Sequence, residues 1–245
     1  MAARRSNHPP EPGEFHPPTG DRPALFWGAD GPAGYGMRDF YIALVPRRIA
    51  CDIIIANHYS GRVVANSYVH MGVYRMGVLV GVLQWGYALN PARTAHIVAG
   101  STSTDYLELN RMWLSDDAPR NSESRAISYA LHYVRRAMPW VRWVQSFADE
   151  RCGRWGVVYQ ACSFLYVGYH RSTFWHLDGE WFHKIAATAA TRGGVRGARL
   201  RADLARATRH EFRQFRYVFM LRRDARRDLK LKPLPYPKPG THDDG

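Results

Sequence analysis

Cysteine is scarce in this sequence. Its 245 residues include three cysteines, and no two of them form a C-x-x-C pair. This excludes a disulfide scaffold and argues against a cysteine-rich zinc site. Lysine is scarce too, because only four of the 34 basic residues are lysines. The arginine excess suits bidentate phosphate binding, although a GC-rich genome produces the same bias.

Long apolar runs are also missing. The best stretch, residues 71–89, is interrupted by Arg75 and by weakly apolar residues. A membrane span needs about 18 or more consecutive apolar residues, so none is predicted. The chain does not open with a charged and then apolar signal segment, and we therefore expect it in the cytoplasm.

Positive charge is concentrated near the end of the chain. The sequence has a net charge of +13, and residues 184–245 hold 16 Lys and Arg against 6 Asp and Glu. Within this region, arginines recur at helical spacing at positions 199, 206, 209, 213 and 216. They form either a solvated helix face or a surface for a polyanion such as double-stranded DNA, and the concentration of charge favours the polyanion.

The composition predicts one folded domain with a tail. Apolar residues make up 46% of the chain, an ordinary globular value. Residues 1–24 contain six prolines and are expected to form a flexible tail. We expect the core at residues 25–185, followed by a basic extension of the same domain at residues 186–245.

The middle of the chain reads as mixed α/β. Helices are predicted at 47–57, 122–138 and 153–162, because apolar residues recur every three or four positions or helix-start signals occur. Strands are predicted at 37–45, 66–75, 78–88, 106–114, 141–147, 164–169 and 173–185. Met76-Gly77 and Asp178-Gly179 are the expected hairpin turns.

The loop before the long helix is a candidate phosphate site. Arg120, Asn121, Ser122, Glu123 and Ser124 join a central strand to a helix N-terminus, where backbone N–H groups and the helix dipole attract anions. A simple capped helix, with Asn121 or Ser122 as the cap, explains the same residues. Neither G-x-x-x-x-G-K-[ST] nor G-x-G-x-x-G occurs in the sequence.

The predicted order of elements resembles the GNAT acetyltransferase architecture, which holds the CoA pyrophosphate at such a loop. That family usually carries R/Q-x-x-G-x-G/A there, and this chain lacks the glycines. The fold class is therefore α/β, an acyltransferase-like fold with a single central mixed, mostly antiparallel sheet flanked by helices.

Longer blocks resemble the bacteriophage Mom family. These are NHYSGR (57–62), LNRMWLSDDAPRNSESRAIS (109–128), SFADERCGRWGVVYQACSFLYVGY (146–169) and LPYPKP (234–239). The resemblance implies a GNAT-like fold, and conversion of adenine in phage DNA to an N6-methylcarbamoyl derivative that resists host restriction endonucleases. It also implies acetyl-CoA as the acyl source and a bound iron.

The same resemblance implies the functional residues. The catalytic set would be His58, Tyr59, Arg111, Ser124, Asp149 and Tyr159. CoA would bind at residues 120–124, and His58, Tyr59 and Asp149 would hold iron through imidazole and oxygen ligands.

Most of these residues have two explanations, a role in the reaction and an ordinary structural role. Asp149 would orient or deprotonate the adenine N6 amine, or cap the turn before Gly153. Arg111 would pair with Asp149 or Glu123, or hold a phosphate. Ser124 would donate to the thioester carbonyl or the leaving thiolate, and Tyr159 would protonate that thiolate. Alternatively, His58 is a loop histidine, Ser124 a helix-start residue and Tyr159 a core residue.

Three functions therefore compete: a DNA adenine-modifying transferase, a small-molecule or protein N-acetyltransferase, and a non-catalytic DNA-binding module. The second leaves the basic C-terminal region unexplained, and the third leaves the CoA-like loop unexplained. A reacting adenine must leave the base stack, so aromatic side chains should line its site. Most tryptophans fall in predicted strands and are expected in the core, and the sequence defines neither these aromatics nor the oligomeric state.

Overall fold

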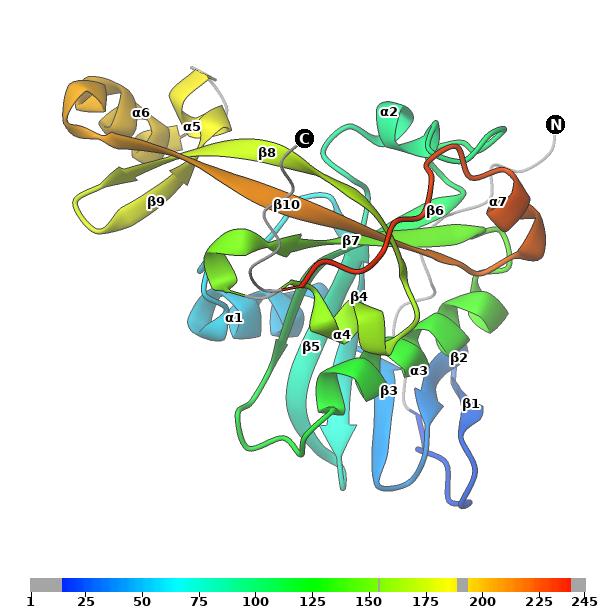
Figure 1. Ribbon diagram of the computed structural model, residues 1–245. Helices are drawn as coiled ribbons and strands as arrows, with labels where there is room; N and C mark the ends of the chain where they lie inside the picture. Colours follow the sequence, from blue (N-terminus) through cyan, green and yellow to red (C-terminus); the bar gives the residue numbers. More distant parts are fainter. Residues whose placement is uncertain (1–14, 154, 189–193, 239–245) are drawn as a thin grey trace, which may run out of the picture. The chain divides into compact units, whose positions relative to one another are not determined.

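The computed structural model describes residues 15–153, 155–188 and 194–238 (Figure 1). The chain forms two compact units. The first comprises Met1–Ser146, Val158–Leu165 and Val218–Lys232, and the second comprises Phe147–Val157, Tyr166–Tyr217 and Pro233–Gly245. The segments 1–24, 25–185 and 186–245 stay a prediction, and residues 1–14 of the expected tail lie outside the described residues.

The first unit is built on a sheet whose strands follow one another in chain order. They are β1 (Ala24–Gly28), β2 (Gly31–Gly36), β3 (Phe40–Leu44), β4 (Ser67–Arg75), β5 (Val78–Gly86), β6 (Tyr106–Leu114) and β7 (Trp143–Asp149). Residues 147–149 of β7 belong to the second unit. Neighbours are antiparallel from β1 to β6, whereas β6 and β7 are parallel. This confirms the predicted mixed, mostly antiparallel sheet.

Two helices cover opposite faces of this sheet. On one face, Ala50 and Ile54 of α1 (Arg47–Asn57) pack with Val82 and Tyr74. On the other face, the ring centroid of Tyr129 of α3 (Ser122–Ala137) lies 5.5 Å from the ring centroid of Tyr35. Because successive strand residues point to opposite faces, both faces of the sheet carry apolar side chains, and the apolar stripe of each helix packs against one of them.

Shorter helices complete the first unit. They are α2 (Pro91–Ala95), α4 (Val157–Ala161) and α7 (Arg223–Arg227), and Val157 itself belongs to the second unit. Arg142 connects α7 to the unit by ion pairs to Asp224 at 2.9 Å and to Asp228 at 2.6 Å. No helix within the described ranges is long and apolar enough to cross a membrane.

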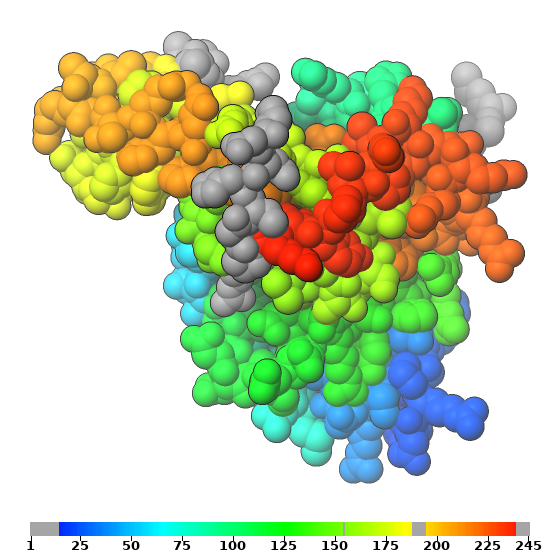
Figure 2. Space-filling view, viewed as in Figure 1, coloured from blue at the N-terminus to red at the C-terminus, as the bar shows by residue number. Residues whose placement is uncertain are grey.

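The second unit contains most of three neighbouring strands of the sheet, in the order β10, β8, β9. Its elements are η1 (Glu150–Cys152), β8 (Leu165–Leu177), β9 (Glu180–His183), α5 (Lys184–Thr188), α6 (Gly194–Ala202), η2 (Leu204–Arg206) and β10 (Thr208–Met220). Leu177, Phe182 and Leu200 form its core, against which Trp175 packs. The α5–α6 segment lies against one side of the strands (Figure 1 and Figure 2).

The helix expected through Arg199, Arg206, Arg209, Arg213 and Arg216 is wrong. α6 ends at Ala202 and β10 begins at Thr208, so the last three arginines lie on a strand. Aromatic and β-branched residues crowd positions 212–219, and strand pairing beside β8 overrides the helical spacing of the arginines. Arg213 and Arg216 consequently point to opposite faces of the sheet.

Carboxylates neutralise several of these arginines. Arg199 and Arg206 both pair with Asp178, at 3.0 and 2.9 Å, and Arg209 pairs with Glu211. Arg213 pairs with Glu150 at 2.8 Å. The predicted row of phosphate-binding arginines therefore does not exist as one continuous surface.

We expect Arg213→Gln to destabilise the protein by about 2 kcal/mol, because it leaves the Glu150 carboxylate partly buried without its ion pair. The Arg213 side chain is 14% exposed. Although burial raises the pKa of Glu150, hydrogen bonds and charge from Arg213 lower it below its usual value. Urea denaturation measures the change. Arg209→Gln, whose arginine is 55% exposed, is the matched control, with an expected loss below about 1 kcal/mol. Equal losses in the two variants would contradict a structural role for the buried pair.

Candidate functional site

The crossover from β6 through α3 to β7 positions a pocket in the first unit. Since β6 and β7 are parallel, the connection returns along the sheet and places the start of α3 at the carboxyl end of β6. Ligands in α/β sheets bind at such an edge. The α3 N-terminus has no side-chain cap, so its first-turn N–H groups lack intrahelical acceptors.

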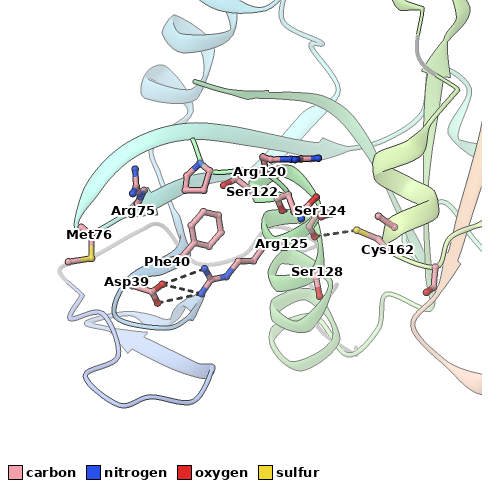
Figure 3. Close-up of a pocket in the computed structure, with 14 residues that line it drawn as sticks. Asp39, Phe40, Arg75, Met76, Arg120, Ser122, Ser124, Arg125, Ser128 and Cys162 are labelled. Carbon is pink, nitrogen blue, oxygen red and sulfur yellow. Dashed lines mark hydrogen bonds and ion pairs between the residues drawn. The ribbon is translucent and has the colours of Figure 1, made fainter. Parts of the chain in front are cut away.

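A cavity of about 650 Å³ opens at this helix start (Figure 3). Its walls come from the β2–β3 connection, the β4–β5 turn, the loop before α3, and the end of α4. The lining residues are Asp39, Phe40, Arg75, Met76, Pro119, Arg120, Asn121, Ser122, Ser124, Arg125, Ser128, Ala161, Cys162 and Ser163.

The pocket wall is basic. It carries three arginines against a single carboxylate, Asp39. Arg125 forms an ion pair with Asp39 at 3.4 Å, and its guanidinium lies 4.6 Å from the ring centroid of Phe40 (Figure 3). Arg75 and Arg120 add two further guanidinium groups, which together with the helix N-terminus favour a polyanionic ligand.

Most of the predicted loop lines this pocket. Arg120, Asn121, Ser122 and Ser124 contribute to the wall, whereas Glu123 is not among the lining residues. Asn121 takes the N-cap position in a left-handed conformation, with φ of 67°, and its side chain makes no cap hydrogen bond. Capping by the Asn121 side chain is therefore wrong.

Cys162 faces the serines of α3. Its thiol donates to the backbone oxygen of Ser124, with a separation of 3.2 Å, and the Ser124 hydroxyl donates to the oxygen of Asn121 at 3.0 Å. Burial raises the pKa of Cys162 to about 11. The thiol therefore stays protonated near neutral pH, which is unsuited to a nucleophile.

His58, Tyr59 and Arg111 lie together at the end of α1. The rings of His58 and Tyr59 are 4.2 Å apart, and Tyr59 is 67% exposed. Arg111, on β6, donates from Nε to the oxygen of Arg62 at 3.1 Å and from Nη1 to the oxygen of Asn110 at 2.7 Å. The structure thus brings these three predicted residues together in the first unit.

His58 is held as a neutral donor. The backbone N–H of Ser60 donates to its Nδ1 at 3.1 Å, which leaves the ring proton on Nε2. Burial, and then the charge of Arg111, lower the pKa of His58 to about 4. A protonated Nε2 is a hydrogen-bond donor and has no lone pair to offer a metal.

The predicted iron ligands do not fit a metal. Among the described residues, no group of three or more His, Cys, Asp and Glu is arranged to hold an ion. Asp149 has its own guanidinium partner, Arg151.

Two buried histidines predict a loss of stability in mild acid. Burial and, to a smaller extent, the charge of Arg47 lower the pKa of His70 to about 4. Burial and, to a smaller extent, the charge of Arg111 lower the pKa of His58 to about 4. Unfolded histidines titrate near 6.5, so between about pH 6.5 and 4 only the unfolded chain takes up these protons. The free energy of unfolding should fall as pH drops through that window, by about 2 kcal/mol for His70 at pH 5. Urea denaturation at pH 7 and pH 5 tests this, and His70→Gln should reduce the difference. A difference unchanged by that substitution would contradict the role of His70.

Tyr159 lies in the core of the first unit. Its hydroxyl accepts a hydrogen bond from the Ser146 hydroxyl at 2.8 Å, and the side chain is 9% exposed. The Ser146 Oγ also lies 3.1 Å from the carbonyl oxygen of Leu109, and its single proton serves one of these two acceptors at a time. Tyr159 therefore joins α4 to β6 and β7.

Asp149 belongs to the second unit. It caps η1 by accepting the backbone N–H of Arg151 at 3.0 Å. The Arg151 side chain reaches both carboxylate oxygens, at 3.1 and 3.0 Å from Nε. The expected cap is confirmed, and Asp149 forms its ion pair with Arg151.

Sequence reasoning predicted four of the fourteen residues that line the pocket and missed the other ten. Asp39, Phe40, Arg75 and Cys162 come from segments far from the loop in sequence. One signal was local: Ser124 and Ser128 are four residues apart and therefore share a face of α3.

The mixed α/β fold carries a basic pocket at a helix start, and comparison with known proteins shows that the chain is a transferase. A model described as the Mom protein family matches residues 39–238. The methylcarbamoylase mom of Escherichia phage Mu is 54% identical over 208 residues, which are 84% of this chain and 86% of that protein. The chain belongs to the Mom protein family, as its sequence blocks predicted.

Solved acetyltransferase structures are similar in fold. The ribosomal-protein-S5-alanine acetyltransferase of Vibrio fischeri aligns with a TM-score of 0.45 and 8% identity, over 82% of this chain and 99% of that chain. An acetyltransferase of the GNAT family from Streptococcus pneumoniae gives 0.45 and 8%, over 74% and 99%. Arabidopsis thaliana NAA60 in complex with acetyl-CoA gives 0.47 and 10%, over 74% and 99%.

Proposed function

We propose that this protein modifies adenine in phage DNA, converting it to an N6-methylcarbamoyl derivative. Acetyl-CoA would supply the methyl and carbonyl carbons, and a second co-reactant, a nitrogen donor at the oxidation level of hydroxylamine, would supply the nitrogen between them, with free CoA and water as the by-products. The observation that carries the proposal is 54% identity to a phage Mu protein named as a methylcarbamoylase. The modification would protect phage DNA from host restriction endonucleases inside the host cytoplasm.

Acetyl-CoA would bind in the pocket at the start of α3. Pyrophosphate needs several donors and positive charge, and the uncapped helix with Arg75 and Arg120 supplies both. The volume of about 650 Å³ suits part of a nucleotide-sized ligand. Ser124 would direct its hydroxyl to the thioester.

The remaining predicted residues would act on the two substrates. His58 would donate a hydrogen bond from Nε2, beside the exposed ring of Tyr59 and the guanidinium of Arg111. Asp149, fixed by Arg151, would accept a hydrogen bond from the adenine N6 amine and orient it. Tyr159, bonded to Ser146, would be a proton donor to the leaving thiolate or would position α4.

Double-stranded DNA would be drawn by positive charge. The described part of the second unit contains eleven Lys and Arg against six Asp and Glu. Contacts between such charges and phosphates are independent of sequence and weaken steeply with salt, which suits an enzyme that visits many adenines.

The test is the nucleoside mass spectrum of plasmid DNA from cells that express the protein. A new, heavier adenine nucleoside with the mass of the methylcarbamoyl adduct is the expected result, together with resistance of the plasmid to digestion. Unmodified DNA alongside measurable CoA binding would instead favour a small-molecule or protein N-acetyltransferase. Unmodified DNA without CoA binding would favour a DNA-binding module.

A further inference from the structure

The sheet of the second unit has one face covered and one face carrying a row of rings. Trp175 of β8 pairs with Phe182 of β9, and both pack in the core formed with α5 and α6. The next pair along the two strands is His176 with Trp181. Because side chains alternate, this pair points away from the helices, to the other face.

Four rings gather on that face, and we name them the ring platform: His176, Trp181, His210 and Phe212. The Trp181 ring centroid is 4.7 Å from that of His176, 5.0 Å from His210 and 5.5 Å from Phe212. His210 and Phe212, two residues apart on β10, stack with an interplanar angle of 12°. Trp181 is 38% exposed, and the other three rings are half-buried.

Ring contacts connect the ring platform to Arg151 and, through it, to Asp149. Phe174 lies 6.0 Å from Phe212, and the Arg151 guanidinium lies over Phe174 at 3.7 Å and 5.9 Å from the Trp181 ring. Arg151 in turn holds the Asp149 carboxylate through its Nε. A continuous series of rings therefore ends at the guanidinium that positions this carboxylate.

We propose that the ring platform binds an unstacked base of the DNA strand, with Trp181 as the main stacking surface. This rests on the proposed function, which requires an adenine outside the base stack. An exposed aromatic face on a strand surface provides stacking without base preference, as in single-strand binding sheets. The excess of eleven basic over six acidic side chains in the described part of this unit complements the phosphates on either side of such a base.

The experiment compares binding of the full chain to a short single-stranded DNA and to the same strand carrying abasic sites, by fluorescence anisotropy. Wild type should prefer the strand with bases. Trp181→Leu keeps an apolar side chain but removes the π face, so its affinity for that strand should fall about tenfold, while affinity for the abasic strand stays unchanged. Trp181→Phe should retain most of the preference.

Trp27→Leu is the matched control, because Trp27 is 64% exposed on β1 of the first unit. It should bind both strands as wild type does. The proposal is overturned if Trp181→Leu still prefers the strand with bases, or if it loses affinity for both strands equally, which would indicate a loss of folding or charge. Modified adenine in wild-type cells with no binding change in Trp181→Leu would refute the ring platform alone. Absence of modified adenine in wild-type cells would refute the proposed function even where the stacking preference holds.

Discussion

Replacing Asp149 by alanine is expected to abolish adenine modification in cells while the protein stays folded. The side chain is 10% exposed and fixed by Arg151, so it is placed to orient one group of a substrate. Losing an orienting hydrogen bond and its charge should lower the rate by at least about a hundredfold. The readout is the ratio of modified to unmodified adenine nucleoside in plasmid DNA.

The alanine variant also removes the cap of η1, and that cap alone is worth about 1 kcal/mol. Asp149→Asn separates the two effects, because the amide oxygen still accepts the Arg151 N–H while the charge is gone. We expect it to stay folded, with a loss of about 2 kcal/mol from the broken ion pair with Arg151, and to modify DNA as poorly as the alanine variant. Normal modification by the asparagine variant would leave Asp149 with a capping role only.

Arg151→Lys tests positioning by the guanidinium. A lysine keeps the charge but cannot reach both carboxylate oxygens from a planar fork. Modification should therefore fall less than in Asp149→Ala, with the loss appearing in the maximal rate more than in DNA affinity.

The first unit could be predicted well because its signals are local. Met76 and Gly77 both take positive φ, 48° and 81°, as the expected hairpin turn requires. The apolar stripe on residues 122–138 predicted α3 to within one residue of its observed end, and Pro46 precedes α1 as expected. β1 and β2 were missed, because the GPAGYG of β2 has no alternation of apolar and polar residues.

The segment of β10 was predicted as a helix because its sequence contains both a helical and a strand periodicity. Its arginines follow a spacing of three to four, whereas Phe215 and Tyr217 alternate with Gln214 and Arg216 in the manner of a strand. Pairing beside β8 decided the outcome, and no local signal reports that partner. The loop at 120–124 was predictable, since a helix start is local; the opposite wall of its pocket, with Asp39 and Arg75, required the packed sheet.

Filling the pocket should remove CoA binding. Ser124→Trp places a large ring in a cavity of about 650 Å³, between the loop and the end of α4. The ring would occupy the space proposed for the co-substrate and displace its pyrophosphate from the helix start. We expect CoA affinity to fall at least about a hundredfold by calorimetry, while DNA affinity stays unchanged because the proposed DNA surface is in the second unit.

The matched control is Arg135→Trp, which places the same ring on an exposed position of α3 outside the pocket lining. Its CoA affinity should equal that of wild type, which separates occlusion from a general effect of tryptophan on the helix. Arg120→Ala should reduce CoA affinity about tenfold without blocking the cavity, since it removes one charge-assisted contact. If Ser124→Trp binds CoA normally, the co-substrate lies elsewhere. If both tryptophan variants lose CoA equally, the loss comes from α3 itself. Only a loss confined to Ser124→Trp and Arg120→Ala assigns the pyrophosphate to the start of this helix.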